Sequence, residues 1–463
     1  MKRKKIPFNI VIAAMTAVMF SSCKKFLQID PPETQAELSR IFTDDQTAIS
    51  ATVGLYTQFT TSGLNFCNSG LTLYPAQSAD EVYNVSQSAN DETFRSNSLL
   101  SSSSIVRAMF WTNPYKNIYQ ANAVLEGLSS SLTLTPAIKS QLLGEMLYIR
   151  ALHYFYLVNL YGDVPLLKST DFEINSLMPR TSVQAVYKQI IEDLLMSRDL
   201  LTPTFVSSVS TRPNKGAVCG LLARVYLYQQ NWEAAESIAS EVISSGKFTL
   251  ETLPTVFIGT SKESLFSITK TTGNSVDGTL FIPSSGTVRP TYALTDQLFA
   301  AFSSIDNRKV NWLKSNTVAG TTYFYPNKYK VRASTPITES LIVQRLAEIY
   351  LIRAEARANL NKLSEGIDDL DMIRSRAGLP KIKITNPTIG KEDLLTAIGK
   401  ERQLELFCEW GHRWFDLKRL GKVDAVLAPI KGVTWNRGDA FYPIPQTEIQ
   451  RNPNLIQNDG YAN

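Results

Sequence analysis

Residues 221–243 read LLARVYLYQQNWEAAESIASEVI, and two apolar-periodic segments meet in them at Asn231-Trp232. In both segments apolar residues recur at intervals of three and four, which is the period of an α-helix. Small alanines on one face and large Tyr or Leu on the other let two antiparallel helices approach closely. We therefore predict a helix pair over 215–230 and 232–245, joined by a tight turn at Asn231-Trp232.

A second copy of this pattern stands further along the chain. Residues 345–351 read RLAEIYL, and residues 366–376 carry the helical period of a following partner. The alanine and tyrosine of Ala223-x-x-Tyr226 recur in Ala347-x-x-Tyr350. These units resemble tetratricopeptide helix pairs, but they are not in tandem, which excludes a strict solenoid.

The remaining chain divides into helical and irregular stretches. Helical periodicity predicts further helices over 44–59, 107–128, 136–161, 181–200 and 391–420. Residues 60–104 are rich in Ser, Asn and Gly, and an insertion over 247–335 contains only short strand-like runs at Ser264–Thr269 and Thr321–Tyr325. The predicted fold is mostly α, with tetratricopeptide-like helix pairs as a scaffold and an inserted irregular region that carries short strands. We expect four parts along the chain. They are a leader (1–22), an N-terminal helical part with an irregular loop at 60–104 (23–245), the insertion (246–340), and a C-terminal helical part with a wrapped tail (341–463).

The N-terminus has the three parts of an export signal. Four cations at 2–5 precede an apolar run over 6–20, and two serines then precede Cys23. A cysteine here is typical of a bacterial lipoprotein signal, although Phe20 stands where leucine is usual. We predict lipidation of Cys23, with an ordinary secretory signal as the alternative. The run is short for a spanning helix and no later run reaches about 20 apolar residues, so we expect attachment through a lipid anchor only.

The net charge of the chain belongs mostly to this leader. The 463 residues carry a formal charge of +5, and four of the 47 basic residues lie at 2–5. The other basic residues nearly balance the 42 acidic ones. A near-neutral remainder removes the electrostatic argument for nucleic-acid binding.

The sequence lacks the residue patterns of common catalytic and metal sites. His153 and His412 are its only histidines, and both lie in segments that read as helices, so neither a zinc site nor a Ser-His-Asp triad is expected. Cys67, Cys219 and Cys408 form no CxxC pair, and we interpret Cys219 and Cys408 as small buried hydrophobic residues. We expect no enzymatic activity, no cofactor and no metal site.

Two long motifs stand near the C-terminus. Residues 400–420 read KERQLELFCEWGHRWFDLKRL, and residues 442–461 read YPIPQTEIQRNPNLIQNDGY. They are similar to the patterns E-R-x-x-E-x-x-x-E-G-x-R-W-x-D-L-x-R and P-I-P-x-x-E-x-x-x-N-P-x-L-x-Q-N-x-G-Y of the SusD/RagB family, except that Trp410 stands between Glu409 and Gly411. With KKFLQIDPP at 24–32 and the helix pairs, the resemblance spans essentially the whole chain.

The residues of these motifs favour a structural role. Glutamates at intervals of four and two arginines can form ion pairs along a helix, and three prolines stiffen a tail that is expected to wrap back over the helices. Two tyrosines are the expected anchors of that tail. These residues are Glu401, Glu405, Glu409, Arg402 and Arg413 in the helix, and Tyr442 and Tyr461 in the tail.

The resemblance implies a lipid-anchored, surface-facing outer-membrane protein. Members of the family capture nutrient and deliver it to a partner TonB-dependent transporter of the SusC kind. They typically bind glycan fragments, and RagB-like members handle peptides. The implied mechanism is binding and release, in which no bond is broken.

No ligand-binding residue transfers by motif, so the candidate site rests on placement alone. Sugars present an apolar C–H face and a fringe of hydroxyls, which aromatic rings and polar side chains recognise. Exposed aromatics in the irregular segments and their polar neighbours are therefore the candidates, with Trp312 as the first choice: Trp312, Tyr74, Tyr83, Tyr323, Tyr325, Asp80, Asn84, Arg289 and Asn311.

Three alternatives remain open on the sequence. A peptide-capturing protein of the same architecture would use backbone-type hydrogen bonds and apolar pockets in place of an aromatic platform. A structural interaction protein would use only the surface of its helix pairs. A glycoside hydrolase, which needs two converging carboxylates, is the least favoured class.

Overall fold

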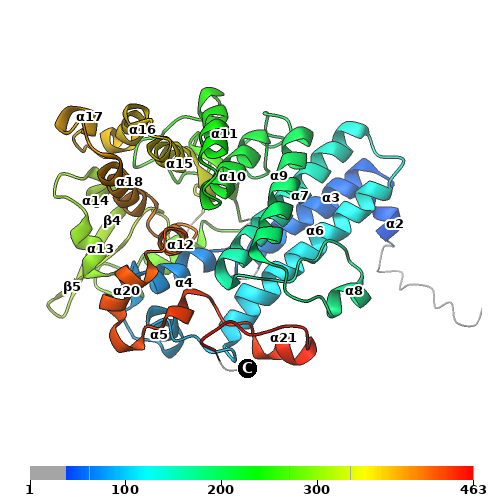
Figure 1. Ribbon diagram of the computed structural model, residues 1–463, viewed down its shortest axis with the longest axis horizontal. Coiled ribbons are helices and arrows are strands. Elements are labelled where there is room, and N and C mark those ends of the chain that lie inside the picture. Colours follow the sequence, from blue (N-terminus) through cyan, green and yellow to red (C-terminus); the bar gives the residue numbers. More distant parts are fainter. Residues whose placement is uncertain (1–37, 62, 271, 334, 462–463) are drawn as a thin grey trace, which may run out of the picture.

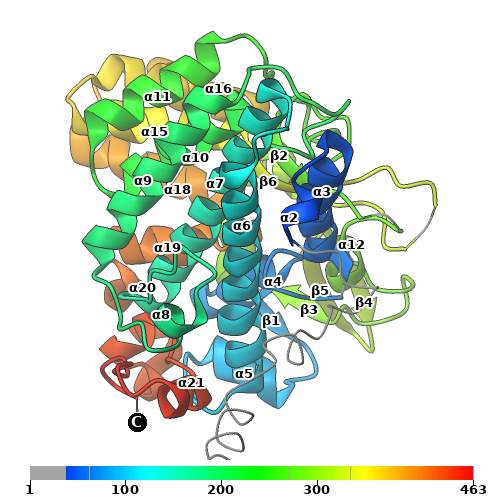
Figure 2. The same cartoon turned by 90° about the vertical axis from the view of Figure 1, so that its right-hand side faces the viewer.

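The computed structural model describes residues 38–461 with the exception of 62, 271 and 334. It is mostly helical, as the sequence predicts. The long helices lie on one side of the molecule, and the short strands of the insertion lie on the other (Figures 1 and 2). The leader and Cys23 lie outside the described residues.

Helix α7 (Pro136–Tyr161) is the centre of the N-terminal part, and its bounds are those predicted. It begins with a proline, which costs no hydrogen bond because backbone N–H groups in the first turn of a helix have no intrahelical acceptor. It ends at Gly162, which has a φ of 74°. Side chains on all its faces are buried beyond Leu142, because neighbouring helices surround it. The other helices of this part are α2 (Leu38–Ile41), α3 (Asp45–Thr61), η2 (Val106–Thr112), α6 (Asn113–Ser130), α8 (Phe172–Ser176) and α9 (Val183–Leu200).

The two predicted helix pairs are present. They are α10 (Lys215–Tyr228) with α11 (Trp232–Ser244), and α15 (Leu346–Asn359) with α16 (Leu363–Arg376). Asn231 caps α11, since its side chain accepts a hydrogen bond from the Ala234 backbone N–H. Helix α11 packs directly against α15, so the two pairs are neighbours in space although the insertion separates them in sequence (Figure 1).

The strands form three two-stranded antiparallel sheets with strand orders β1-β3, β2-β6 and β4-β5, of which the first joins the insertion to the N-terminal part and the second joins it to the strand that follows it. Strands β2 and β5 confirm the predicted runs at Ser264–Thr269 and Thr321–Tyr325. Short helices connect the strands. The bounds are β1 (Val82–Asn84), β2 (Ser264–Ile268), β3 (Tyr292–Leu294), β4 (Leu313–Val318), β5 (Thr321–Pro326), β6 (Leu341–Arg345), α12 (Val276–Phe281), α13 (Asp296–Ala301) and α14 (Asn307–Trp312).

The prediction of an irregular stretch over 60–104 is wrong in part. It contains the helices α4 (Gly70–Ala79) and α5 (Ala89–Arg95), and every residue of α4 is buried. Gly70 allows the first turn of α4 to pass close to the backbone of Asn65, because a Cβ at this position would lie 2.4 Å from the Asn65 carbonyl oxygen. The Ser and Gly residues of this segment have low helix propensity, so the sequence did not predict α4. Tertiary packing stabilises the helix in spite of that low propensity.

The C-terminal part contains α17 (Ile382–Thr385), α18 (Lys391–Leu406), α19 (His412–Arg419), α20 (Val423–Lys431), η3 (Gly432–Thr434), η4 (Arg437–Ala440) and α21 (Gln446–Arg451). The helix predicted over 391–420 is therefore interrupted. Cys408, Trp410 and Gly411 all have positive φ values, of 50°, 44° and 71°. The turn lets the Trp410 indole N–H donate to the Ile342 carbonyl oxygen at 2.7 Å, a tertiary bond that sequence periodicity cannot report.

The glutamates of the α18 motif form ion pairs, but mostly with cations from other parts of the chain. The Arg345 guanidinium donates to both Glu405 and Glu409, and Arg308 lies 2.7 Å from Glu401. These side chains are almost wholly buried. Arginine attraction outweighs the cost of burial for Glu405, whose pKa lies well below its usual range. The motif thus ties α18 to the insertion, in agreement with its predicted structural role.

Candidate functional site

Two of the predicted aromatic residues come together on the insertion side of the molecule. Tyr83 lies in β1, which pairs with β3, and Tyr323 lies in β5, which contacts β3. Both side chains are half-buried. Partial burial raises the pKa of Tyr83, and the nearby Asp296 and Tyr323 raise it further, which places the three groups in one neighbourhood.

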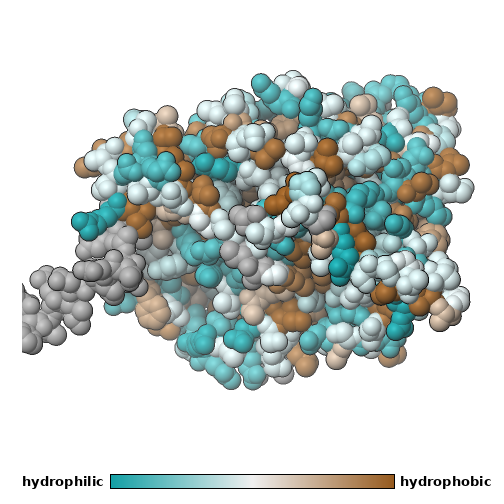
Figure 3. Space-filling view, turned by 180° about the vertical axis from the view of Figure 1, so that it is seen from behind, coloured by the Kyte–Doolittle hydropathy of each residue, from teal (hydrophilic) through white to brown (hydrophobic). Residues whose placement is uncertain are grey.

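Asn316 holds a loop against this pair. It is the cross-strand partner of Tyr323, so both side chains lie on the same face of the β4–β5 hairpin. Its amide nitrogen donates to the carbonyl oxygens of Ser285 and Val288, both at 2.8 Å. We call the region formed by Tyr83, Tyr323, Asn316 and residues 284–289 the aromatic surface. Figure 3 views this side of the molecule, on which hydrophilic and hydrophobic residues are interspersed.

The prediction that Trp312 is exposed is wrong. Its side chain is 0% exposed, and its indole N–H donates to the Leu253 carbonyl oxygen at 2.8 Å. Lys328 lies over its ring, 4.7 Å from the centroid, and Phe257 packs edge-on against it. Burial leaves Trp312 no free face for a sugar, so the side chain acts here as a core residue.

Tyr74 and Tyr325 are also buried, contrary to the prediction. Tyr74 belongs to the buried helix α4, and its ring centroid lies 4.3 Å from that of Phe94. Tyr325 is 2% exposed at the inner end of β5. A position in a segment predicted as irregular or short-strand did not make these rings accessible, because every residue of α4 is buried and the inner end of β5 packs into the molecule.

The polar candidates have separate positions. Asn84 is buried and donates to Asp91 at 2.8 Å, so it tethers its own loop. Asp80 ends α4 with a φ of 103°; its carboxylate lies 3.8 Å from Arg413, and its pKa is raised by burial and lowered by Arg413 and Lys431. Asn311 donates to the Asn307 carbonyl oxygen at the end of α14. Of the polar candidates only Arg289, which is exposed, belongs to the aromatic surface as defined above.

The sequence reasoning missed two aromatic residues on the opposite face of the same hairpin. Phe299 and Phe324 stack with centroids 3.8 Å apart and an interplanar angle of 20°. The Lys309 ammonium lies 4.4 Å from the Phe299 centroid. Alternation along β5, in which Tyr323 and Phe324 point to opposite faces, is the sequence signal that indicates a second aromatic face.

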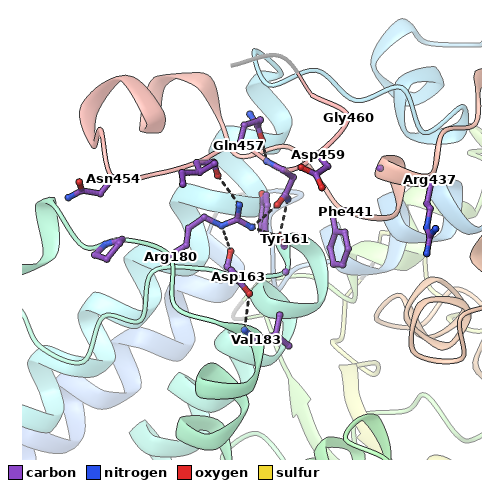
Figure 4. Close-up of a pocket in the computed structure, with 15 residues that line it drawn as sticks. Tyr161, Asp163, Arg180, Val183, Arg437, Phe441, Asn454, Gln457, Asp459 and Gly460 are labelled. Atoms are coloured by element: carbon purple, nitrogen blue, oxygen red, sulfur yellow. Dashed lines mark hydrogen bonds between the residues drawn. The ribbon is translucent and has the colours of Figure 1, made fainter.

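A hollow of about 820 Å³ lies elsewhere, where the C-terminal tail crosses the end of α7 (Figure 4). Arg180 lies at its centre and donates to the backbone oxygens of Asp163, Tyr161 and Ile456 and to the Asn458 side chain. The Arg180 guanidinium is thus occupied by hydrogen bonds that hold the C-terminal tail in place. Tyr461 donates to the Phe441 carbonyl oxygen and Tyr442 is fully buried, so both predicted anchors are confirmed.

The described residues also contain histidines, free cysteines and carboxylates, the kinds of titratable side chain that could ligate a metal. Within residues 38–461, as far as they are described, no group of three or more His, Cys, Asp or Glu side chains is placed to hold a metal ion. Burial lowers the pKa of His153 and of His412 to about 4, and His153 hydrogen-bonds the Ile149 carbonyl oxygen and Asn117. Cys67, Cys219 and Cys408 are free and buried.

Among the helices of the described part of the chain, none combines the length and the apolar character needed to cross a membrane.

Known proteins match both halves of the chain. A family model described as "SusD family" matches residues 297–461, and one described as "Starch-binding associating with outer membrane" matches residues 25–227. SusD-like proteins P38 and P25 of Formosa agariphila are 26% and 24% identical to it; P38 aligns over 83% of this chain and 86% of its own length, and P25 over 98% and 99%.

Solved structures share the fold. A SusD superfamily protein from Bacteroides vulgatus has a TM-score of 0.77 at 20% identity, with 91% of this chain and 100% of that chain covered. A laminarin binding SusD-like protein has a TM-score of 0.74 at 24% identity, with 90% and 99% covered. The two C-terminal motifs, the paired helices and these matches agree, and the chain belongs to the SusD family.

Proposed function

We propose that this protein captures a glycan without cleaving it and delivers it to a TonB-dependent outer-membrane transporter of the SusC kind. A lipid on Cys23 would hold it at the outer membrane, facing the cell surface. The family description names starch binding and outer-membrane association, and one protein of the same fold binds laminarin, a glucan. These matches support a glycan as cargo.

The observation that carries the proposal is the convergence of Tyr83 and Tyr323. They come from segments far apart in the sequence, and each leaves part of its ring in solvent. Aromatic rings of this kind stack on the C–H face of a sugar, while the neighbouring Asp296 and the backbone of residues 284–289 offer partners for its hydroxyls. The surface lies on strands that the helical scaffold supports.

Binding of the full chain, purified in mild detergent, to a panel of polysaccharides and a peptide digest tests the proposal. Calorimetry with Tyr83→Ala and Tyr323→Ala should show several-fold to about tenfold weaker glycan binding, since one aromatic stacking contact is worth about 0.5–1.5 kcal/mol. Tyr119→Ala is the matched control, because Tyr119 is 53% exposed on α6, away from the surface.

Three results would count against this assignment. Equal binding by all three variants would remove the aromatic surface as the site. Uptake of peptides with no binding of any glycan would favour the peptide-capturing alternative. Failure of the tagged protein to co-purify with an outer-membrane transporter from detergent-solubilised envelopes would contradict the delivery step.

A further inference from the structure

The solvent-accessible charges of the insertion, which carries Tyr323 of the aromatic surface, are strongly one-sided. In residues 265–340, six basic residues are exposed or half-buried, and Asp296 is the one acidic residue that is not buried. Among the described residues, none of the six cations forms a salt bridge, whereas the buried Arg308 and Lys328 are both paired with carboxylates. The six are Lys270, Arg289, Lys309, Lys314, Lys330 and Arg332.

Lys314 shares a face of the β4–β5 hairpin with the tyrosine of the surface. Residues 314 and 316 of β4 pair with 325 and 323 of β5, and alternate residues of a strand point to the same side. Lys314 is therefore the diagonal neighbour of Tyr323, and such neighbours stand about 7–8 Å apart. Its side chain is exposed, and its charge is near enough to Lys330 to lower the pKa of that residue.

Arg289 and Arg332 stand at the two ends of the loop that Asn316 holds. Arg289 directly follows Val288, whose carbonyl oxygen accepts from Asn316. Arg332 donates through Nε to the Ile282 carbonyl oxygen at 3.1 Å, and its side chain is exposed. Arg289 thus belongs to the loop of the aromatic surface, and Arg332 is hydrogen-bonded to Ile282, two residues before that loop begins.

We propose that the glycan held on the aromatic surface is anionic, with its carboxylate or sulfate groups paired to Arg289, Lys314 and Arg332. The inference rests on the proposed function and adds the charge class of the ligand. Guanidinium and ammonium groups form charge-assisted hydrogen bonds with such anions, and an unneutralised set of one sign attracts a polyanion over several ångströms. A neutral glycan would offer these three cations no counter-ion, whereas buried cations of the insertion such as Arg308 and Lys328 are paired with carboxylates.

The test compares each charged polysaccharide with its own neutral form, using the full chain in mild detergent. Polygalacturonate and its methyl ester form the carboxylate arm, and a sulfated galactan and its desulfated form provide the sulfate arm. The variant Arg289→Gln/Lys314→Gln/Arg332→Gln should bind the preferred polyanion at least tenfold more weakly. Wild-type binding should also weaken as NaCl rises from about 0.05 to 0.5 M, because salt screens exposed charges.

A matched variant controls for net charge. Lys188→Gln/Lys247→Gln/Lys400→Gln removes three exposed cations, which lie on α9, shortly after α11 and on α18, and should leave affinity within about twofold, with the thermal midpoints of both variants near that of the wild type. Equal binding of the charged and neutral forms, with no effect of the Arg289 triple variant, would overturn the anionic assignment but leave glycan capture intact. Silence toward every charged and neutral glycan would instead refute the proposed function on which it rests.

Discussion

Arg224 and Glu348 form a bidentate ion pair in the core, with both nitrogen–oxygen distances at 2.6 Å and both side chains 1% exposed. They stand 124 residues apart, at equivalent positions directly after Ala223 and Ala347 in the two helix pairs. The same repeat position therefore carries opposite charges, and the pair links α10 to α15 across the insertion.

Breaking this pair from one side should destabilise the protein strongly. Arg224→Leu or Glu348→Leu leaves an unpaired buried charge, and each should lower the free energy of unfolding by about 3–5 kcal/mol. The double variant removes both charges and should lose much less than the sum of the two. Urea unfolding of the three variants measures this, and additive losses would show that the two residues do not interact.

Both histidines should make the fold less stable at acidic pH. Their folded pKa values of about 4 lie below the unfolded value of 6.5, so between pH 6.5 and 4 the unfolded chain binds protons that the folded chain does not. Stability therefore falls as pH falls through this range, by up to about 3 kcal/mol for each histidine. His153→Gln cannot titrate, so its unfolding free energy should change less between pH 7 and 5 than that of the wild type. An unchanged pH dependence would contradict the assignment.

Trp312 should matter for stability and not for ligand contact. Trp312→Ala opens a large cavity and strands the Leu253 carbonyl oxygen, and it should lower the free energy of unfolding by about 3–5 kcal/mol. Trp312→Phe keeps most of the volume and should bind glycan as the wild type does. Calorimetric affinity and thermal unfolding separate the two roles. A folded Trp312→Phe that has lost glycan binding would restore this residue as part of the site.

Asn316 should act as a positioning residue for the loop at 284–289. Asn316→Ala removes both amide bonds to that loop, and glycan affinity should fall several-fold with a stability loss of only about 1–3 kcal/mol. Asn175→Ala is the matched control, because Asn175 likewise ties a loop by donating to the Ser169 carbonyl oxygen, on the helical side. Equal effects of the two variants on affinity would mean that loop position is irrelevant to binding.

Cys23 should carry the membrane anchor. Cells that express the wild-type chain should incorporate an alkyne-labelled fatty acid into it, and Cys23→Ser should abolish the label and release the protein from the membrane fraction. Cys67→Ser provides the control, because Cys67 is buried in the folded protein. Retention of the label in Cys23→Ser would place the lipid elsewhere.

Local signals were enough to predict α7 and the two helix pairs. Helix α7 occupies its predicted residues because Pro136 and Gly162 mark its ends and its apolar residues recur without interruption. The two helix pairs follow from alanine and tyrosine at matching positions. The sequence did not predict helix α4, because its Ser, Thr and Gly residues are poor helix formers. The helix is stabilised by burial on every side.

The site was harder to predict, because exposure is not a local property. Tyr323 and Tyr325 are two positions apart in one strand, yet the first is half-buried and the second is 2% exposed. Trp312 stands in the insertion that the sequence marks as irregular, but Phe257, Lys328 and Phe407 close over it. A sequence indicates which rings are present and not which of them other segments cover.

The sequence by itself determined helix α7, the paired units and the family motifs, because periodicity, caps and motif spacing are properties of neighbouring residues. Only the tertiary structure decided which cations meet the glutamates of α18 and which tyrosines reach solvent. Those outcomes depend on interactions between segments far apart in the chain, such as the ion pair of Arg345 with Glu405 and the packing of β3 against β5. Long-range packing sets the burial of each group, and burial decides whether a side chain stabilises the fold or remains available to a ligand.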